Sequence, residues 1–426
     1  MEKKKRILLC LAHMSGNEMK YIKEAFDTNW VVPLGPNVNA FEDDLKRYVT
    51  SNNAGETIAE LQGKEVVALA SGTSAVHLAL IALGVGPGDE VMCQSFTFCA
   101  SSHPVKYQGA TPVFVDSEAQ SWNMDPQLLD EAIADRISKT GRKPKAIIDV
   151  YLYGMPGKIK EIMQVAQKYD IPLIEDAAEG FGSRYDGQVV GTYGQYGVLS
   201  FNGNKMITTS GGGALICPNA EAKQRVMFYA TQAREAFPYY QHEHIGYNYR
   251  LSNICAGIGR GQMTVLDDHI AHHHHIAKRY AQAFAQVPGI TYHGNPDEHC
   301  DSNFWLSTIV LSPELKVKGQ DQAYATAVQG AVGGAAGVVH STGAVHTACE
   351  PNANVEAMRV ALDKADIESR PLWKPMHLQP VYKDCPAYTN GVSEQLFKTG
   401  LCLPSGPMVT DEDVDRVIEA ILSNIE

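Results

Sequence analysis

The stretch that decides the fold class of this chain reads SFNGNKMITTSGGG and covers residues 200–213. It joins two apolar segments, residues 198–201 and 213–216, that we expect to be strands. A single lysine, Lys205, lies between them among small, β-branched and glycine residues. Most lysines are solvated, but such surroundings suit a lysine that acts as a nucleophile toward a carbonyl carbon. The stretch therefore predicts a reactive lysine beside the end of a strand.

On the N-terminal side of this stretch, short apolar runs alternate with amphipathic segments. The runs with the composition of strands are residues 66–69, 90–94, 112–115, 146–150 and 171–174. The segments with the period of helices are residues 75–83, 128–137 and 158–168. Strands that alternate with helices at this spacing indicate βαβ units, so we expect an α/β fold with a mostly parallel central sheet.

The two ends of the chain differ from this alternating middle. Near the N-terminus, residues 17–26 and 39–48 have helical patterns. After about residue 262 the expected elements are a helix through residues 279–285, strands near residues 290–293 and 305–311, and a helix over residues 411–425. We therefore predict a large α/β domain with a helical N-terminal segment over residues 1–262, and a smaller α+β domain over residues 263–426.

Two tracts of the predicted smaller domain have a biased composition. In residues 321–350, 18 of the 30 residues are Ala, Gly or Val, so we expect an insertion with little fixed structure rather than a functional lid. Four consecutive histidines occupy residues 272–275. Consecutive side chains on a helix point round most of its circumference and cannot all face one ion, so we expect a solvated helix face rather than a metal site.

Composition excludes several classes of protein. The 426 residues carry 36 Lys and Arg against 48 Asp and Glu, and a formal net charge of −12 makes the chain a poor candidate for binding a nucleic acid polymer. No apolar run approaches the ~18 residues that indicate a membrane span. The nine cysteines are scattered, so we expect free thiols in a reducing, cytoplasmic compartment rather than a disulfide framework or a zinc site.

Two further segments carry polar groups to the ends of expected strands. Ser71-Gly72-Thr73-Ser74 precedes a helix, where N–H groups, a glycine and hydroxyls can form a cradle for a phosphate. The alternative interpretation is an ordinary helix N-cap. Glu175 and Asp176 follow the strand at residues 171–174, and ligands of open parallel sheets bind at the carboxyl ends of strands. The alternative for Asp176 is a cap for a following helix.

Together with Lys205, these segments supply the parts of a pyridoxal phosphate (PLP) site. The cradle would anchor the phosphate, Asp176 would keep the pyridine nitrogen protonated so that the ring is an electron sink, and the lysine would form the Schiff base. An aromatic side chain is expected against the ring, and Ser95-Phe96-Thr97-Phe98 follows the second strand. We therefore predict PLP as the cofactor, with no metal.

At these motifs the sequence resembles the DegT/DnrJ/EryC1/StrS sugar aminotransferases, which are fold-type I PLP enzymes. The shared motifs are SGTSA at residues 71–75, EDAA at residues 175–178, the stretch at residues 200–213 and GYNYRLS at residues 246–252. Within the family the chain is most similar to the 4-aminotransferases that make UDP-4-amino-4,6-dideoxy-N-acetylglucosamine in the bacillosamine pathway. That closer similarity lies in RPLWKPMH at residues 370–377 and LPSG at residues 403–406.

The resemblance implies roles at the cofactor. Lys205 would be the catalytic lysine and Asp176 the partner of the pyridinium nitrogen. Phe98 would stack on the ring. The residues implied at the phosphate are Gly72, Thr73, Ser200 and Asn248. Asn248 would come from the neighbouring subunit, which would make a homodimer with shared active sites the smallest complete enzyme.

The resemblance also implies contacts with the substrate. Glu179 stands where many family members have Gln beside the cofactor hydroxyl, and the bacillosamine-type enzymes resemble this chain in having Glu there. It would bind both cofactor and substrate. His377 would lie near the sugar. The implied reaction moves an amino group from L-glutamate to the 4-keto carbon of a UDP-4-keto-6-deoxy-N-acetylhexosamine.

Four other functions compete with this interpretation. One is an aminotransferase for another nucleotide-linked keto sugar, either dTDP-linked or ketonic at C3. Another is a PLP-fold binding protein without turnover, which would be expected to lack Lys205 or Asp176. A deoxysugar dehydratase of this family would have His in place of Lys205. A Rossmann dehydrogenase would need Gly-x-Gly-x-x-Gly after the first strand, and the chain has Ser71-Gly72-Thr73-Ser74 there.

Overall fold

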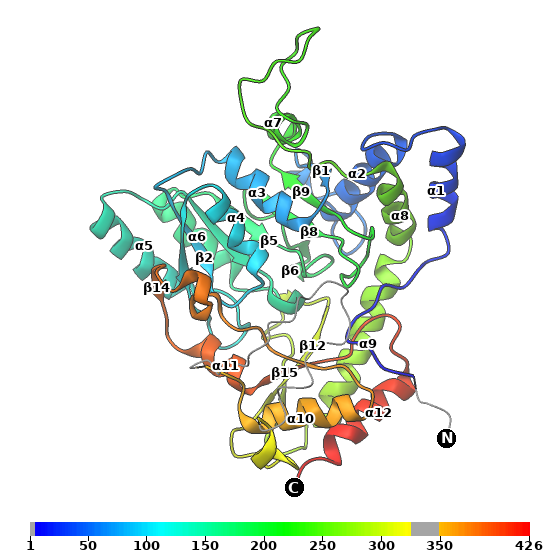
Figure 1. Cartoon of the computed structure of the whole chain (residues 1–426), viewed down its shortest axis with the longest axis vertical. Helices are drawn as coiled ribbons and strands as arrows, with labels where there is room; N and C mark the ends of the chain where they lie inside the picture. Colours follow the sequence, from blue (N-terminus) through cyan, green and yellow to red (C-terminus); the bar gives the residue numbers. More distant parts are fainter. Residues whose placement is uncertain (1–4, 325–348) are drawn as a thin grey trace.

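The structure is a computed structural model, which describes residues 5–324 and 349–426 and is drawn in Figure 1. Most of the tract predicted as an insertion over residues 321–350 lies outside the described residues. Within the described part, no helix is long and apolar enough to cross a membrane. All nine cysteines lie in that part and are free thiols, as their scattered spacing predicted.

A sheet that has eight strands in the described residues forms from the alternating middle of the sequence. Its strands are β1 (Glu65–Leu69), β2 (Glu90–Gln94), β3 (Thr111–Val115), β4 (Ala146–Val150), β5 (Leu173–Asp176), β8 (Tyr196–Ser200), β9 (Gly213–Cys217) and β14 (Ala387–Tyr388). They lie in the order β1-β9-β8-β5-β4-β2-β3-β14. β9 runs antiparallel to both neighbours, whereas the other strands share one direction. The predicted mostly parallel sheet is confirmed.

Helices cover both faces of this sheet (Figure 1). The flanking helices are α2 (Pro36–Val49), α3 (Gly72–Ala82), α4 (His103–Tyr107), α5 (Pro126–Thr140), α6 (Ile159–Tyr169) and α7 (Ala220–Ala230). Buried side chains of α3, α4 and α7 pack on one face, and those of α2, α5 and α6 pack on the other. The central strands are therefore buried on both sides, which explains their near-continuous apolar sequences. Beside α2 lie α1 (Glu18–Asp27) and α8 (Asn253–Met263).

A second, antiparallel sheet forms in the C-terminal part of the chain. Its strands are β10 (Ile290–Tyr292), β12 (Ser307–Leu311), β15 (Gly400–Leu403) and β13 (Arg370–Pro371), in that order. Its helices are α9 (Leu266–Phe284), α10 (Ala353–Lys364), α11 (Val392–Thr399) and α12 (Asp411–Leu422). Thr410 caps α12 by accepting a hydrogen bond from the N–H of Asp413, so this helix begins where the sequence predicted. The remaining elements are the strands β6 (Arg184–Tyr185), β7 (Gln188–Val189) and β11 (Cys300–Asp301), and the 3-10 turns at Ala59–Leu61, Cys99–Ser101, Leu152–Gly154, Gln320–Gln322, Met376–Leu378 and Pro380–Tyr382.

The N-terminal and C-terminal parts exchange segments. Ile7 pairs with Ile367 and is buried in the core of the C-terminal part. In the opposite direction, β14 adds to the edge of the large sheet beside β3, and β11 pairs with β6. We therefore propose the predicted division near residue 262 for the two cores, with these exchanged segments crossing it.

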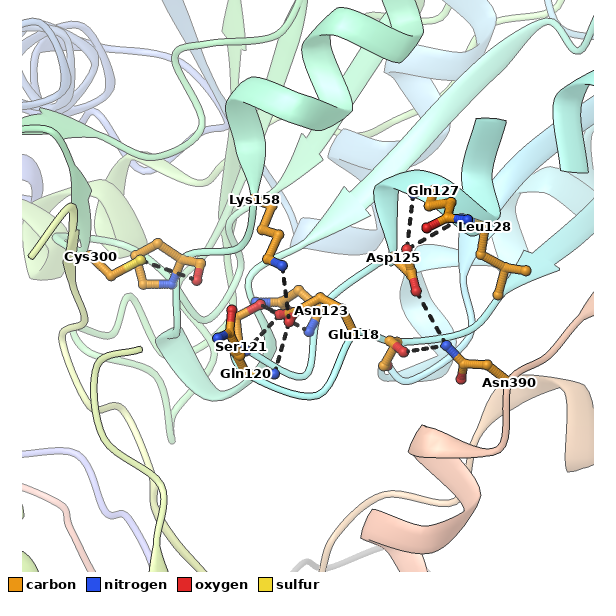
Figure 2. A network of polar contacts seen from close by, with 12 residues as sticks. Glu118, Gln120, Ser121, Asn123, Asp125, Gln127, Leu128, Lys158, Cys300 and Asn390 are labelled. Atoms are coloured by element: carbon orange, nitrogen blue, oxygen red, sulfur yellow. Dashed lines mark hydrogen bonds and ion pairs between the residues drawn. The ribbon is translucent and has the colours of Figure 1, made fainter. Parts of the chain in front are cut away.

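A polar network fixes one crossing, as Figure 2 shows. The Asn390 side-chain amide, which follows β14, donates to the carbonyl oxygen of Ser117 over 2.9 Å and to the Asp125 carboxylate over 3.3 Å. Asp125 also caps α5. Nearby, Glu118 accepts hydrogen bonds from the backbone of its own turn and lies 3.7 Å from the Lys158 ammonium. The turn after β3 is therefore rigid and holds the C-terminal segment against the large sheet.

The expectation of a solvated face for the histidines at residues 272–275 is wrong for most of the tract. His273 has no exposed surface, and His272 and His274 are half-buried. The reason is that α9 is covered on several sides, by the turn before β12 and by the segment that leads into α12. The described residues contain no cluster of three or more metal-ligating side chains, and the accompanying expectation of no metal site stays a prediction.

Candidate active site

A cavity of about 270 Å³ opens at the carboxyl ends of β1, β4, β5 and β8. Seven residues that the sequence assigned to a cofactor line it: Gly72, Thr73, Phe98, Asp176, Glu179, Ser200 and Lys205. They come from four separate stretches of sequence, and the parallel strands bring them to one edge of the sheet. The structure therefore places most of the predicted site residues around one cavity.

The predicted phosphate cradle is the start of α3. Ser71 is its N-cap, and its hydroxyl accepts a hydrogen bond from the N–H of Ser74. The N–H groups of Gly72 and Thr73 stand in the first turn, where a helix offers them no partner. The capping interpretation is confirmed, the first-turn N–H groups are available to a phosphate, and the helix begins at Gly72, earlier than the predicted residue 75. A Cβ on Gly72 would lie 3.1 Å from the Cβ of Ser200, so glycine permits the close approach of these two segments.

Asp176 ends β5 and is buried in the cavity wall. It accepts hydrogen bonds from the Ser101 hydroxyl over 2.7 Å and from the N–H of Ala178 over 3.2 Å. Burial raises the pKa of Asp176, and the bonds from Ser101 and Ala178 and the charge of Lys205 offset part of that rise. A cationic ring nitrogen would stabilise the charged carboxylate further, because an opposite charge favours the ionised form.

Lys205 reaches the cavity from the loop between β8 and β9. Its ammonium lies 3.4 Å from one carboxylate oxygen of Glu179. The other oxygen of Glu179 accepts a 2.7 Å hydrogen bond from the N–H of Tyr153. Burial raises the pKa of Glu179 to about 7, against the opposing effect of Lys205. Glu179 can therefore hold a proton near neutral pH.

Two tryptophans that the sequence did not predict complete the wall. The Lys205 ammonium lies 4.0 Å from the ring centroid of Trp305. Trp373 also lines the cavity, with its ring centroid 5.5 Å from that of Phe98. Both come from segments far along the chain, and only the motif at residues 370–377 pointed to one of them. Ser101, the partner of Asp176, gave no signal in the sequence.

Two predicted site residues do not line the cavity of this chain. Asn248 pairs with Thr231, in a segment beside the end of β1. His377 is not one of the lining residues, and its Nδ1 lies 2.6 Å from the Ser95 hydroxyl. The predicted action of Asn248 from a neighbouring subunit and the predicted contact of His377 with the sugar stay predictions.

The residues present fit PLP. The first turn of α3 offers free N–H donors for a phosphate, and Gly72 lets this turn approach Ser200 closely. A buried carboxylate, Asp176, lines the same cavity, with Lys205 within reach of its charge. A phosphate site, an acid for a ring nitrogen and a lysine amine are the groups that PLP requires.

The chain is similar to known aminotransferases in sequence and in structure. The family model described as the DegT/DnrJ/EryC1/StrS aminotransferase family matches residues 13–334 and 322–422. EpsN of Bacillus subtilis (strain 168), named as a pyridoxal phosphate-dependent aminotransferase, is 42% identical over 424 residues, covering 98% of this chain and 95% of EpsN. The GDP-perosamine synthase of Escherichia coli O157:H7 is 31% identical over 408 residues, covering 96% and 95% of the two chains. The crystal structure of a DegT DnrJ EryC1 StrS aminotransferase from Brucella abortus superposes with a TM-score of 0.79 at 27% identity, covering 96% and 95%.

Proposed function

This chain belongs to the DegT/DnrJ/EryC1/StrS aminotransferase family, and we propose that it aminates C4 of a UDP-linked 4-keto-6-deoxy-N-acetylhexosamine with L-glutamate as the donor. Its fold-type I architecture, its PLP cofactor and its transaminase activity follow from that membership. The proposal adds the sugar, the nucleotide and the amino donor.

One observation carries the proposal. The Lys205 ammonium stands 3.4 Å from Glu179, and Trp373 of the motif at residues 370–377 lines the same cavity. The sequence assigned both Glu179 and that motif to the bacillosamine-type subgroup. Their meeting at the reactive lysine supports a substrate of the type that this subgroup uses.

When bound, PLP supplies an electron sink that makes the Cα hydrogen of the amino donor acidic. Lys205 then acts as the base: its Nζ removes that proton, and in the second half-reaction it delivers a proton to C4 of the sugar. Lys205 is part of the cavity lining, so no separate proton acceptor has to diffuse to the reacting carbon. Its neighbour Glu179 can hold a proton near neutral pH, because burial raises its pKa to about 7.

The remaining residues of the cavity bind and orient. The N–H groups of Gly72 and Thr73 and the hydroxyl of Ser200 would hold the phosphate, with the α3 dipole adding to the attraction. Asp176 would hold the ring nitrogen in its protonated form. Phe98 stands on the open side of the cavity, exposed over 54% of its surface, and is available to cover a ring.

We also propose that the active unit is a homodimer. The segment after α7 projects away from the body of the molecule, as the green loop in Figure 1 shows. Its exposed side chains include Tyr239, Tyr240 and Ile245, of which Ile245 is 83% exposed. A projecting segment with this much apolar surface is typical of a protein interface. Asn248 lies at its base, where a second copy could receive it.

A second candidate is an aminotransferase for a keto sugar on another nucleotide. The name of the relative from E. coli, GDP-perosamine synthase, favours this candidate because it states a GDP-linked sugar. A binding protein without turnover is disfavoured, since Lys205 and Asp176 are both present.

The test is a substrate panel. Purified enzyme would be incubated with L-glutamate and with UDP-, dTDP- and GDP-linked 4-keto and 3-keto sugars, and the products would be identified by NMR. We expect a UDP-linked 4-amino-4,6-dideoxy-N-acetylhexosamine and one equivalent of 2-oxoglutarate. Reaction with only dTDP- or GDP-linked sugars would show that the UDP assignment is wrong while leaving the transaminase activity intact.

A further inference from the structure

The face of Trp305 lies over the reactive lysine. The ring centroid is 4.0 Å from the Lys205 ammonium, and the tryptophan is only 3% exposed. Its indole N–H donates a 2.6 Å hydrogen bond to the carbonyl oxygen of Asn204, the residue next to the lysine. The indole is thus hydrogen-bonded to the loop that carries Lys205, and its face covers the ammonium of that lysine. The ring cannot turn away without losing this hydrogen bond.

Asn303 fixes the tryptophan and the glutamate together. Its side-chain oxygen accepts a 2.8 Å hydrogen bond from the N–H of Trp305. Its side-chain amide donates to the carbonyl oxygens of Glu179 and Phe181, over 2.8 and 2.9 Å. Asn303 is fully buried, so water does not compete for these bonds. Trp305 and Glu179, which both contact the Lys205 ammonium, are therefore held by the same residue, Asn303.

The histidine tract of α9 makes hydrogen bonds to the turn that contains Asn303. Phe304 has a φ of 48°, a left-handed backbone that a bulky side chain adopts only under constraint. Its carbonyl oxygen accepts a 3.0 Å hydrogen bond from Nδ1 of His273. The carbonyl oxygen of Ser302 accepts one from Nε2 of His274 over 2.7 Å. Two consecutive histidines thus clamp the backbone on both sides of Asn303.

The His273 half of this clamp is neutral near pH 7. Burial lowers the pKa of His273 to about 3, and its Nε2 has no hydrogen-bond partner in the described part of the chain. A neutral imidazole with its proton on Nδ1 satisfies the carbonyl of Phe304 and leaves only Nε2 unpaired. His273 is therefore a fixed donor rather than a switch.

We propose that Trp305 is a positioning residue for Lys205, held over it by His273 and His274. The π face of an indole attracts a cation, and it does so most strongly where water is excluded. Trp305 then keeps the charged nitrogen of Lys205 in the cavity, close to Glu179. The other charged or titratable groups that act on this nitrogen are Asp176 and the thiol of Cys10, from the N-terminal segment.

The positioning role of Trp305 does not depend on the proposed substrate. Its readout is the pH at which the visible absorbance of the PLP-loaded enzyme changes, because the nitrogen of Lys205 carries the positive charge in the low-pH form. No sugar or amino donor is present in this titration. A wrong sugar, nucleotide or donor would leave the result unaffected.

The first test compares Trp305→Leu and Trp305→Phe with the wild type. Loss of the π face in Trp305→Leu should lower the midpoint of the absorbance titration by about 0.5–1 pH unit. Trp305→Phe keeps a ring and should lower it by less. If Trp305→Leu does not fold, the Phe variant still decides. Two variants that bind PLP and titrate at the wild-type midpoint would overturn the positioning role.

The second test uses a matched pair inside the histidine tract. His275 contacts Asp411 of the C-terminal segment, not the turn that carries Trp305. We expect His274→Ala to lower the midpoint, His275→Ala to leave it unchanged, and His274→Gln to restore it, since a glutamine amide can replace the Nε2 donor. Equal midpoints for His274→Ala and His275→Ala would overturn the clamp.

Discussion

The floor and the roof of the cavity are built in different ways. The floor consists of residues at the carboxyl ends of strands in the large sheet, such as Gly72, Asp176 and Ser200. The roof consists of Trp305 and Trp373, which arrive on connections in the C-terminal part. The floor carries the groups that any PLP chemistry needs, whereas the roof supplies aromatic surface, with Trp305 over the lysine. Substitutions should therefore affect the chemical step most at the floor, and affinity or positioning at the roof.

The largest effect is expected for Lys205→Ala, which removes the proton-transferring amine. Turnover should fall by about 10³-fold or more, given what general acid–base groups contribute. Initial rates of 2-oxoglutarate formation would measure it. Lys223→Ala is the control, because Lys223 pairs with Glu42 and Glu65 outside the cavity. Normal turnover of the Lys205→Ala protein would refute the assignment of this lysine.

Asp176→Asn should have the next largest effect, because the amide cannot hold a proton on the ring nitrogen by charge. A loss of about 10²-fold in kcat is expected from removing such a group. Ser101→Ala removes only one of the hydrogen bonds to Asp176 and leaves its charge, so it should cost about fivefold to tenfold, as the loss of a hydrogen bond of about 1 kcal/mol would. Steady-state kcat values of the two variants would measure both effects. Equal losses would contradict a role of Asp176 through its charge.

Below the floor, Asp149 should make stability depend on pH. Both of its carboxylate oxygens are buried with no partner in the described residues, and burial raises its pKa to about 8, with Glu175 adding to the rise. The folded chain then holds a proton that the unfolded chain has lost, so wild-type stability falls as the pH rises from about 4 to 8. Asp149→Asn removes this dependence. The difference in unfolding free energy between pH 6 and pH 8 should shrink by about 1–3 kcal/mol, measured by urea titration.

Parallel slopes for the wild type and Asp149→Asn over this range would contradict that assignment. Asp116 offers a matched comparison, since it is equally buried but accepts hydrogen bonds from the N–H groups of Ser117, Gly391 and Ser393. Asp116→Asn leaves one side-chain oxygen in place of two to accept these bonds. It should therefore lower stability at both pH values, while the slope remains because Asp149 is intact.

The difference between floor and roof also explains what the sequence could predict. Asp176 ends β5, and Gly72 and Lys205 lie shortly after β1 and β8, so an apolar run followed by turn residues marks all three without any tertiary information. Trp305 begins the strand predicted near residues 305–311, but its place over Lys205 depends on how α9 holds the preceding turn. The burial of the histidines at residues 272–275 could not be predicted, because segments distant in the sequence cover this helix and leave no periodic pattern in it.

The smallest effect is expected for Trp373→Leu. Its ring contacts those of Phe98 and Tyr153, at centroid distances of 5.5 and 5.1 Å, but it makes no cation–π contact with Lys205 as Trp305 does. The hydrogen bond from its N–H to the Tyr153 hydroxyl belongs to the backbone and survives the substitution. KM for the keto sugar should therefore rise by about threefold to tenfold, as for one lost aromatic contact of about 1 kcal/mol, while kcat and the absorbance midpoint stay unchanged.

Trp122→Leu is the control for loss of an indole. Trp122 stacks on His293, with ring centroids 3.6 Å apart, outside the residues that line the cavity. The Trp122→Leu substitution should lower the melting temperature and leave KM for the keto sugar unchanged. Because Trp305→Leu is expected to move the midpoint and Trp373→Leu only KM, the two variants divide the roof into a part that serves the lysine and a part that serves the sugar. A Trp373 variant that moves the midpoint as far as a Trp305 variant would show that the roof acts as one unit.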